Sequence, residues 1–122
     1  MKPIKTVLLC MIAIFLTASF AFAAGDVEEG KALFNDPKLG TNGSTCNMCH
    51  PDGKGLEKAG AQGKVSWKTP AGTATSLEDA INICITVALK GTALDKKSSK
   101  MQDLVAYIKS LGKKSMNTAP GY

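Results

Sequence analysis

Polar and apolar residues along the chain are ordered in a way that predicts three helices. The first covers the VEEGKALF stretch at 27–34. Asp26 is placed to cap it, and Glu28 and Glu29 fall in its first turn, where the helix dipole favours acidic side chains. This helix should stop before Pro37, because proline disfavours helical backbone in the residue that precedes it.

The second helix is predicted to begin after Ser76, which forms a capping-box-like start with Asp79. Helical spacing then relates Leu77, Ile81, Cys84 and Ala88. A strand is the alternative, because Ile81, Ile83, Ile85 and Val87 alternate and are β-branched. The cap, the length of the run and a terminal glycine, Gly91, favour the helix.

The third helix is predicted from Ser99, with Gln102 completing a capping box, to Gly112. Its apolar stripe consists of Met101, Leu104, Val105, Ile108 and Leu111. The tail at 113–122 is polar and contains Pro and Gly, so we expect it to be mobile. Residues 51–72 show neither a helical nor an alternating period, which predicts a long loop.

The N-terminus has the pattern of a secretory signal peptide. Lys2 and Lys5 precede an apolar run at 7–22 that closes on small alanines. We expect cleavage after Ala23, with Ala24 as the neighbouring choice, so that the domain covers 24–112 and the protein is periplasmic or otherwise exported. The alternative is an uncleaved anchor, since the run approaches the roughly 17-residue minimum for a membrane span.

Composition narrows the class of protein. The chain has 122 residues and a net charge of +5, and without Lys2 and Lys5 it keeps 13 lysines, no arginine and 10 acidic residues. Nucleic-acid recognition depends on arginine forks and basic stripes, so nucleic acid is not an expected partner. A single small domain of this size buries a limited core, which makes a stabilising cofactor plausible.

The chemistry is concentrated in the CNMCH stretch, where Cys46, Cys49 and His50 form the C-x-x-C-H signature of c-type haem attachment. In that chemistry the two thiols become thioethers to the haem vinyl groups, and the histidine binds iron. A redox disulfide would need a thioredoxin-like βαβ surround, which is absent. A structural zinc site needs four ligands, and Cys46, Cys49, Cys84 and His50 supply that number, so a Cys₃His zinc site remains an alternative.

The sequence leaves several candidates for the sixth ligand of the iron. His50 is the sole histidine, so it must be the proximal ligand, and a second histidine ligand within the chain is impossible. Cys10 is removed with the leader, and the two motif cysteines become thioethers. Cys84 is therefore the one free thiol that remains. Met101 lies on the buried stripe of the last helix and is the other main candidate. The remaining alternatives are Met116, Lys100 or another lysine, water, or an open position.

The order of these elements resembles the small single-domain cytochrome c family. That resemblance implies an all-α fold of three to five short helices wrapped round one covalent haem c. In the family, a glycine and an aromatic residue on the first helix pack against an aromatic residue on the last. Gly30 and Phe34, with Tyr107 in LVAYIKSL, fit these places.

One departure from the family pattern is informative. The segment that usually supplies a ligating methionine reads KGTALD here, so Leu94 stands in its place. The stretch from 81 to 111 is more similar to haem domains of thiosulfate dehydrogenases and the catalytic Sox cytochrome subunit, in several of which a cysteine matching Cys84 is the axial ligand. The arginine that follows that cysteine in the Sox subunit is missing, and this chain has one haem motif where thiosulfate dehydrogenases usually have two.

We therefore expect a periplasmic monohaem cytochrome c that carries single electrons between redox partners. The alternatives are a haem subunit of a sulfur-compound oxidation system with Cys84 as axial ligand, and a haem-based sensing module with an open site. Lysines flank the haem loop and the later loop: Lys54, Lys58, Lys64, Lys68, Lys90, Lys96, Lys97 and Lys100. They either steer an acidic redox partner to the haem edge or form an ordinary solvated face.

Replacing both Cys46 and Cys49 by alanine should abolish covalent haem attachment, because no thiol would then remain in the motif. The measurement is haem retained by the denatured chain after electrophoresis, with the wild type as control. Haem that stays on the denatured double variant would contradict the assignment.

Overall fold

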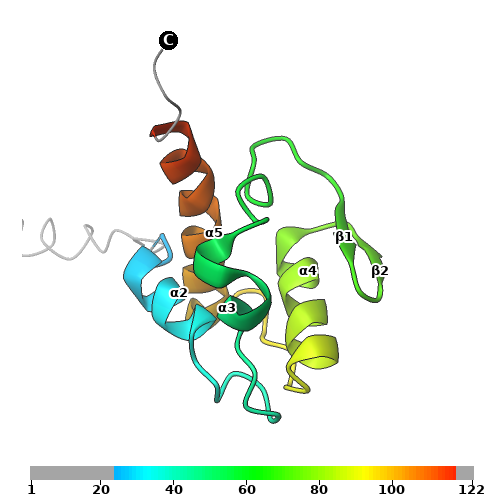
Figure 1. The fold of residues 1–122 in the computed structure, drawn as a ribbon. Coiled ribbons are helices and arrows are strands. Elements are labelled where there is room, and N and C mark those ends of the chain that lie inside the picture. The colour runs from blue at the N-terminus through cyan, green and yellow to red at the C-terminus, as the bar shows by residue number, and fades with distance from the viewer. Residues whose placement is uncertain (1–23, 118–122) are drawn as a thin grey trace, which may run out of the picture.

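The computed structural model describes residues 24–117, which form a helical domain with one small hairpin (Figure 1). The N-terminal leader and the end of the tail, residues 1–23 and 118–122, lie outside the described residues, so the signal-peptide prediction falls outside them as well. In chain order the elements are α2 (Val27–Phe34), α3 (Cys46–Cys49), the 3₁₀ turn η1 (Pro51–Gly53), β1 (Trp67–Thr69), β2 (Gly72–Ala74), α4 (Leu77–Ile83), the π-helical turn η2 (Cys84–Ala88) and α5 (Ser99–Asn117).

The helix α2 begins and ends where the sequence predicts. The Asp26 carboxylate accepts hydrogen bonds from the backbone N–H groups of Glu28 and Glu29, at 2.8 and 3.1 Å. The Asp26 N–H itself donates to the Asp103 carboxylate of α5 at 2.7 Å. The cap therefore starts α2 and also ties it to the last helix.

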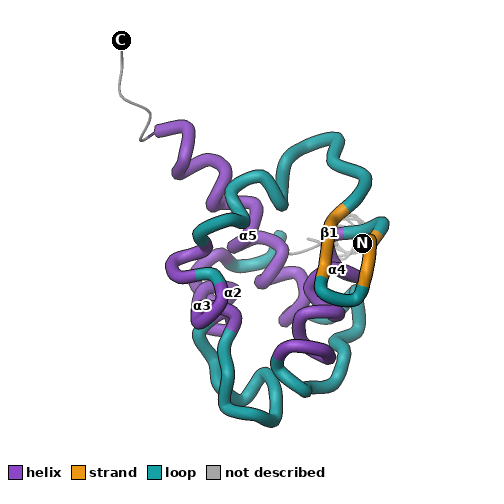
Figure 2. Tube along the Cα trace, turned by 45° about the vertical axis from the view of Figure 1, so that its right-hand side comes forward, coloured by secondary structure: helices purple, strands orange, loops and turns teal. Residues whose placement is uncertain are grey.

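The crossing of α2 over α5 organises the core (Figures 1 and 2). A Cβ at Gly30 would lie 2.0 Å from the Asp103 carbonyl oxygen, so the two backbones are in direct contact there. The rings of Phe34 and Tyr107 stack beside it, with centroids 5.1 Å apart and planes tilted by 59°. The expected packing of Gly30 and Phe34 with Tyr107 is confirmed.

The core continues from this crossing into α4 and η2. Its members share nearly complete burial and come from all four of these elements: Phe34, Leu77, Ile81, Ile85, Leu89, Met101, Leu104, Val105, Tyr107, Ile108 and Leu111. Across residues 24–117 no helix is both long enough and apolar enough to cross a membrane.

The helical interpretation of the second element is confirmed over the strand alternative. The Ser76 hydroxyl oxygen accepts from the Asp79 N–H at 3.1 Å and so caps α4. From Cys84 the helix widens into a π turn, closed by the Leu89 N–H donating to the Cys84 carbonyl at 3.1 Å. The reversal after it falls on Lys90, with φ of 57°, one residue before the glycine expected to end the helix.

The last helix begins at Ser99 as predicted, but its capping contacts and its C-terminal end differ from the prediction. Its capping side chain is Ser98, whose hydroxyl accepts from the Met101 N–H at 3.3 Å. The Gln102 amide donates to the Lys96 carbonyl at 2.8 Å instead of completing a capping box. The predicted stop at Gly112 is wrong, since α5 continues to Asn117. Glycine inside a helix costs only about 1 kcal/mol, which flanking helix-forming residues offset.

The prediction of an uninterrupted loop at 51–72 is also wrong. Residues 67–69 and 72–74 form an antiparallel hairpin, with Trp67 paired to Ala74. The Trp67 indole N–H donates to the Ala59 carbonyl at 2.7 Å and fastens the preceding loop to the hairpin. Strands of three residues are too short to show an alternating period in the sequence. The expected all-α class is therefore correct for the helices, but it did not include this hairpin.

Gly30→Ala should destabilise the protein by about 1–3 kcal/mol, because the added methyl group meets backbone that cannot yield. Alanine would otherwise stabilise a helix by about 1 kcal/mol. Denaturant unfolding of the holo-protein measures the change, and Ala32→Gly, at an exposed position of the same helix, is the matched control. A more stable Gly30→Ala variant would contradict the close crossing.

Candidate functional site

The C-x-x-C-H motif lies on a single helical turn, α3. Thr45 caps this turn by accepting a hydrogen bond from the Met48 N–H at 3.3 Å. The His50 N–H donates to the Cys46 carbonyl at 3.0 Å, so the histidine ends the same turn. Cys46 and Cys49 are three residues apart and therefore neighbours on one helix face. Cys49 is exposed, whereas Cys46 is half-buried against the core.

The ring of His50 is held by the chain that follows it. Its Nδ1 lies 3.1 Å from the Lys54 carbonyl oxygen, which only accepts hydrogen bonds. This contact assigns the ring N–H to Nδ1 and leaves the Nε2 lone pair for a metal, which is the usual arrangement of a ligating histidine. Left-handed backbone at Asp52 and Gly53, with φ of 51° and 79°, turns the chain so that Lys54 reaches the ring.

Cys84 comes from a distant part of the chain but lies near the two motif thiols. Burial raises the pKa of the Cys46 thiol to about 11, and the charge on Cys84 is the next largest cause. Burial also raises the pKa of Cys84, with the charge on Cys49 as the second cause. Because such effects fall off with distance, the three thiols lie close enough to influence one another's ionisation.

The other candidate ligand, Met101, lies in a different environment. Its side chain is completely buried in the core, on the stripe of α5 that also carries Leu104 and Val105. The structure therefore gives Met101 a packing role. The sequence alone placed it on this stripe, and that part of the prediction is confirmed.

The segment that carries Leu94 is fastened to α4 by side chains. The Asn82 amide donates to the Leu94 carbonyl at 2.9 Å and accepts from its N–H at 2.8 Å, and Lys96 forms an ion pair with Asp79 at 2.5 Å. Asp79 and Asn82 share one helix face, and Cys84 is turned about 200° from Asn82. The Leu94 segment and the thiol therefore belong to different faces of this helix.

The zinc alternative is not supported. Within the part of the chain that the structure describes, no three His, Cys, Asp or Glu side chains are grouped to hold a metal ion. A haem needs no such group, because its cysteines bond to carbon atoms at the edge of the macrocycle and one imidazole binds the iron. The donor set of Cys46, Cys49 and His50 fits haem c.

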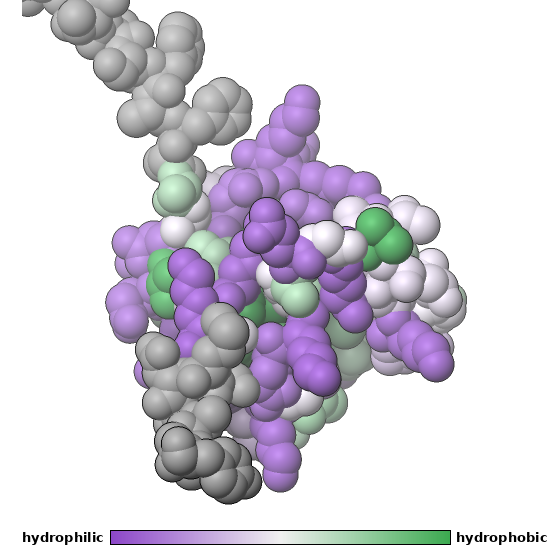
Figure 3. Space-filling view, turned by 90° about the horizontal axis from the view of Figure 1, so that it is seen from above, coloured by the Kyte–Doolittle hydropathy of each residue, from purple (hydrophilic) through white to green (hydrophobic). Residues whose placement is uncertain are grey.

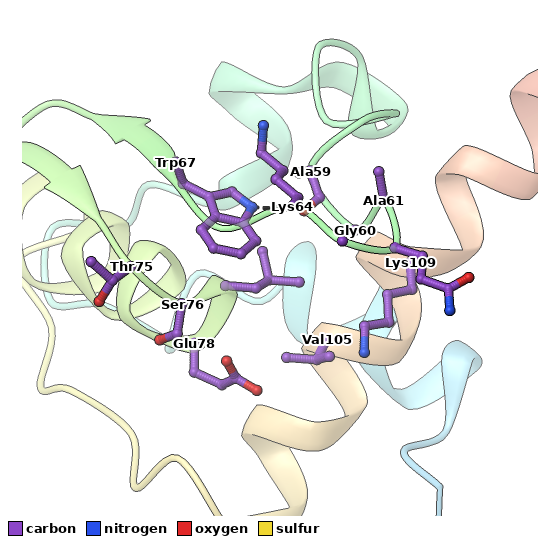
Figure 4. Close-up of a pocket in the computed structure, with 13 residues that line it drawn as sticks. Ala59, Gly60, Ala61, Lys64, Trp67, Thr75, Ser76, Glu78, Val105 and Lys109 are labelled. Carbon is purple, nitrogen blue, oxygen red and sulfur yellow. Dashed lines mark hydrogen bonds between the residues drawn. The ribbon is translucent and has the colours of Figure 1, made fainter.

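A cavity of about 440 Å³ lies between the loop at 59–64, the start of α4 and the middle of α5 (Figure 4). Its apolar wall includes Trp67, Leu77 and Val105, and the Lys64 ammonium lies 5.8 Å from the centre of the Trp67 ring. None of the five main candidate haem or iron ligands lines it: Cys46, Cys49, His50, Cys84 and Met101.

The fold and the motif together define a c-type cytochrome. More particularly, residues 29–116 match the family model of the SoxA/TsdA cytochrome c domain, and the chain belongs to this family. No match was found among curated proteins or solved structures. Membership brings one covalently bound haem c with its iron, and haem-based electron transfer with redox partners.

Two features of the site were missed at the sequence level. One is the Lys54 carbonyl that orients His50, which depends on a left-handed turn at a non-glycine residue, Asp52. The other is the set of contacts between the 40–42 segment and the end of η2. The glycine at 40 and the Thr-Asn pair after it were the available signals, but such residues are typical of any turn.

Proposed function

We propose that this protein is an exported monohaem electron carrier. Cys46 and Cys49 form the thioethers, and His50 is the proximal iron ligand through Nε2. The haem, when attached, supplies one centre that gains and loses single electrons. The observation that carries the proposal is the capped C-x-x-C-H turn with His50 already oriented by the Lys54 carbonyl. The apolar leader at 1–23 supports export.

We further propose Cys84 as the sixth ligand. Two observations favour it over Met101: its thiol lies near both motif thiols, and the π turn starts at this residue. Single π turns inside helices are frequent at functional sites, because the wider turn redirects one side chain. Met101, by contrast, is completely buried in the hydrophobic core.

The redox partner we propose has an acidic docking surface. All eight lysines of the two flanking loops are exposed, and Lys96 is the one paired with a carboxylate among them. Hydrophilic residues cover most of the face seen in Figure 3. Clustered exposed lysines steer an acidic protein and raise its association rate, with strong dependence on salt.

A second candidate function is a haem subunit of a sulfur-compound oxidation system. It is favoured by the family match over 29–116 and by the position of Cys84. The complete absence of arginine from the chain counts against catalysis by this subunit alone, because oxyanion substrates are usually gripped by arginine forks.

Ferric holo-protein mixed with thiosulfate alone should remain oxidised, because an electron carrier has no site that activates the substrate. Haem absorbance, followed without oxygen, measures reduction, and dithionite as the reductant checks that the haem is competent. Rapid reduction by thiosulfate that is lost in Cys84→Ser would favour the second candidate instead.

Cys84→Ser should change the ferric haem spectrum and raise the reduction potential. An anionic thiolate stabilises ferric iron, so its loss favours the reduced state. Met101→Leu is the matched comparison and should leave both spectrum and potential unchanged while costing less than about 1.5 kcal/mol of stability. The opposite pattern, with only Met101→Leu affecting the haem, would make Met101 the ligand.

A further inference from the structure

At the end of the π turn η2, backbone carbonyls are left without hydrogen-bond donors from the turn itself. Helix ends always carry such carbonyls, and they need donors from elsewhere. Here the donors come from Thr41 and Asn42, in the segment just before α3. This segment lies beside the yellow-green end of η2, below α4 in Figure 1.

Four hydrogen bonds join the two segments. The Thr41 N–H donates to the Leu89 carbonyl at 2.9 Å, and the Asn42 N–H reaches the same oxygen at 3.4 Å. The Thr41 hydroxyl donates to the Lys90 carbonyl at 2.6 Å. The Asn42 amide donates to the Ala88 carbonyl at 3.0 Å. The carbonyls of the last residue of η2 and of the two residues after it, Ala88, Leu89 and Lys90, are therefore all held by two consecutive residues.

Two glycines let the backbones come this close. A Cβ at Gly40 would lie 2.1 Å from the Leu89 carbonyl oxygen, and a Cβ at Gly91 would lie 2.6 Å from that of Leu39. Lys90, between them, takes a left-handed conformation with φ of 57° that a lysine adopts only at a cost of about 1–3 kcal/mol. The joint is thus built from direct backbone contact.

Each side of this joint leads directly to a haem-site residue. On one side, Asn42 accepts from the Ser44 N–H at 3.1 Å, and Thr45 then caps the turn that begins at Cys46. On the other side, Cys84 lies one turn of helix before Ala88. The joint therefore links the segment that leads into the C-x-x-C-H turn to the helical turn that carries Cys84.

We propose that Thr41 and Asn42 are positioning residues that hold Cys84 within reach of the iron by tying η2 to the segment before α3. The inference rests on the proposed ligation by Cys84. When the joint is weakened, Cys84 should release the iron more readily and an outside ligand should replace it more easily. The joint itself does not touch the haem.

The experiment is imidazole titration of the ferric holo-protein, followed by the haem spectrum. Thr41→Val removes the hydroxyl donor and should lower the apparent Kd for imidazole by about five- to tenfold, as expected for one lost hydrogen bond. Asn42→Asp removes the amide donor but keeps the acceptor for Ser44, and should act in the same direction. Thr41→Ser keeps the hydroxyl and should restore the wild-type value.

The matched control is Thr86→Val. It makes the same substitution within η2, where the hydroxyl bonds only to carbonyls of its own helix, and should leave imidazole affinity unchanged. Placed in a Cys84→Ser background, Thr41→Val should have no effect, because no Cys84 thiolate remains to compete.

Two different failures can be told apart. If Cys84→Ser by itself leaves imidazole affinity unchanged, Cys84 is not the ligand and the proposed ligation fails together with this inference. If Cys84→Ser raises the affinity but Thr41→Val and Asn42→Asp do not, ligation stands and the positioning role is overturned. An equal effect of Thr86→Val would also overturn it, since general loosening of the helix would then be the cause.

Discussion

The crossing of α2 over α5 is the contact on which the rest of the structure depends. Gly30 allows the two backbones to touch, the Asp26 N–H bonds to Asp103, and Phe34 packs on Tyr107. The core then extends along α5 to α4 and η2. A chain of this size has little further apolar surface to bury, so the elements that carry the chemistry are placed by this single framework.

The framework also divides the sulfur-containing side chains by role. Met101 is on the buried stripe of α5, where its flexible side chain is part of the hydrophobic core. Cys84 lies where the helix opens into a π turn, near the motif thiols and on a face turned away from the segment of Leu94. Leu94, which replaces the usual methionine, is fastened by Asn82, and the Cys84 thiol is the sulfur that we propose for the haem site.

The sequence predicted what depends on local chemistry. The Asp26 and Ser76 caps and the α2 boundaries follow from residue type and spacing, and the structure confirms them. The packing of Phe34 on Tyr107 was implied by the resemblance to the cytochrome c family, and it is confirmed as well. The hairpin at 67–74, the extension of α5 past Gly112 and the carbonyl that orients His50 depend on tertiary contacts. The joint at Thr41 and Asn42 has the same origin, since its partners are more than 40 residues away.

The central claim is that a helix-borne thiol, held near the C-x-x-C-H turn, completes the coordination of the iron. A crystal structure of the oxidised holo-protein tests it most directly, because it shows which atom occupies the sixth position. The account predicts the Cys84 sulfur bonded to iron, with Met101 in the core and Thr41 and Asn42 still bonded to the end of η2. A structure with Met101, a lysine or water on the iron, and the Cys84 sulfur turned away from it, would contradict the account.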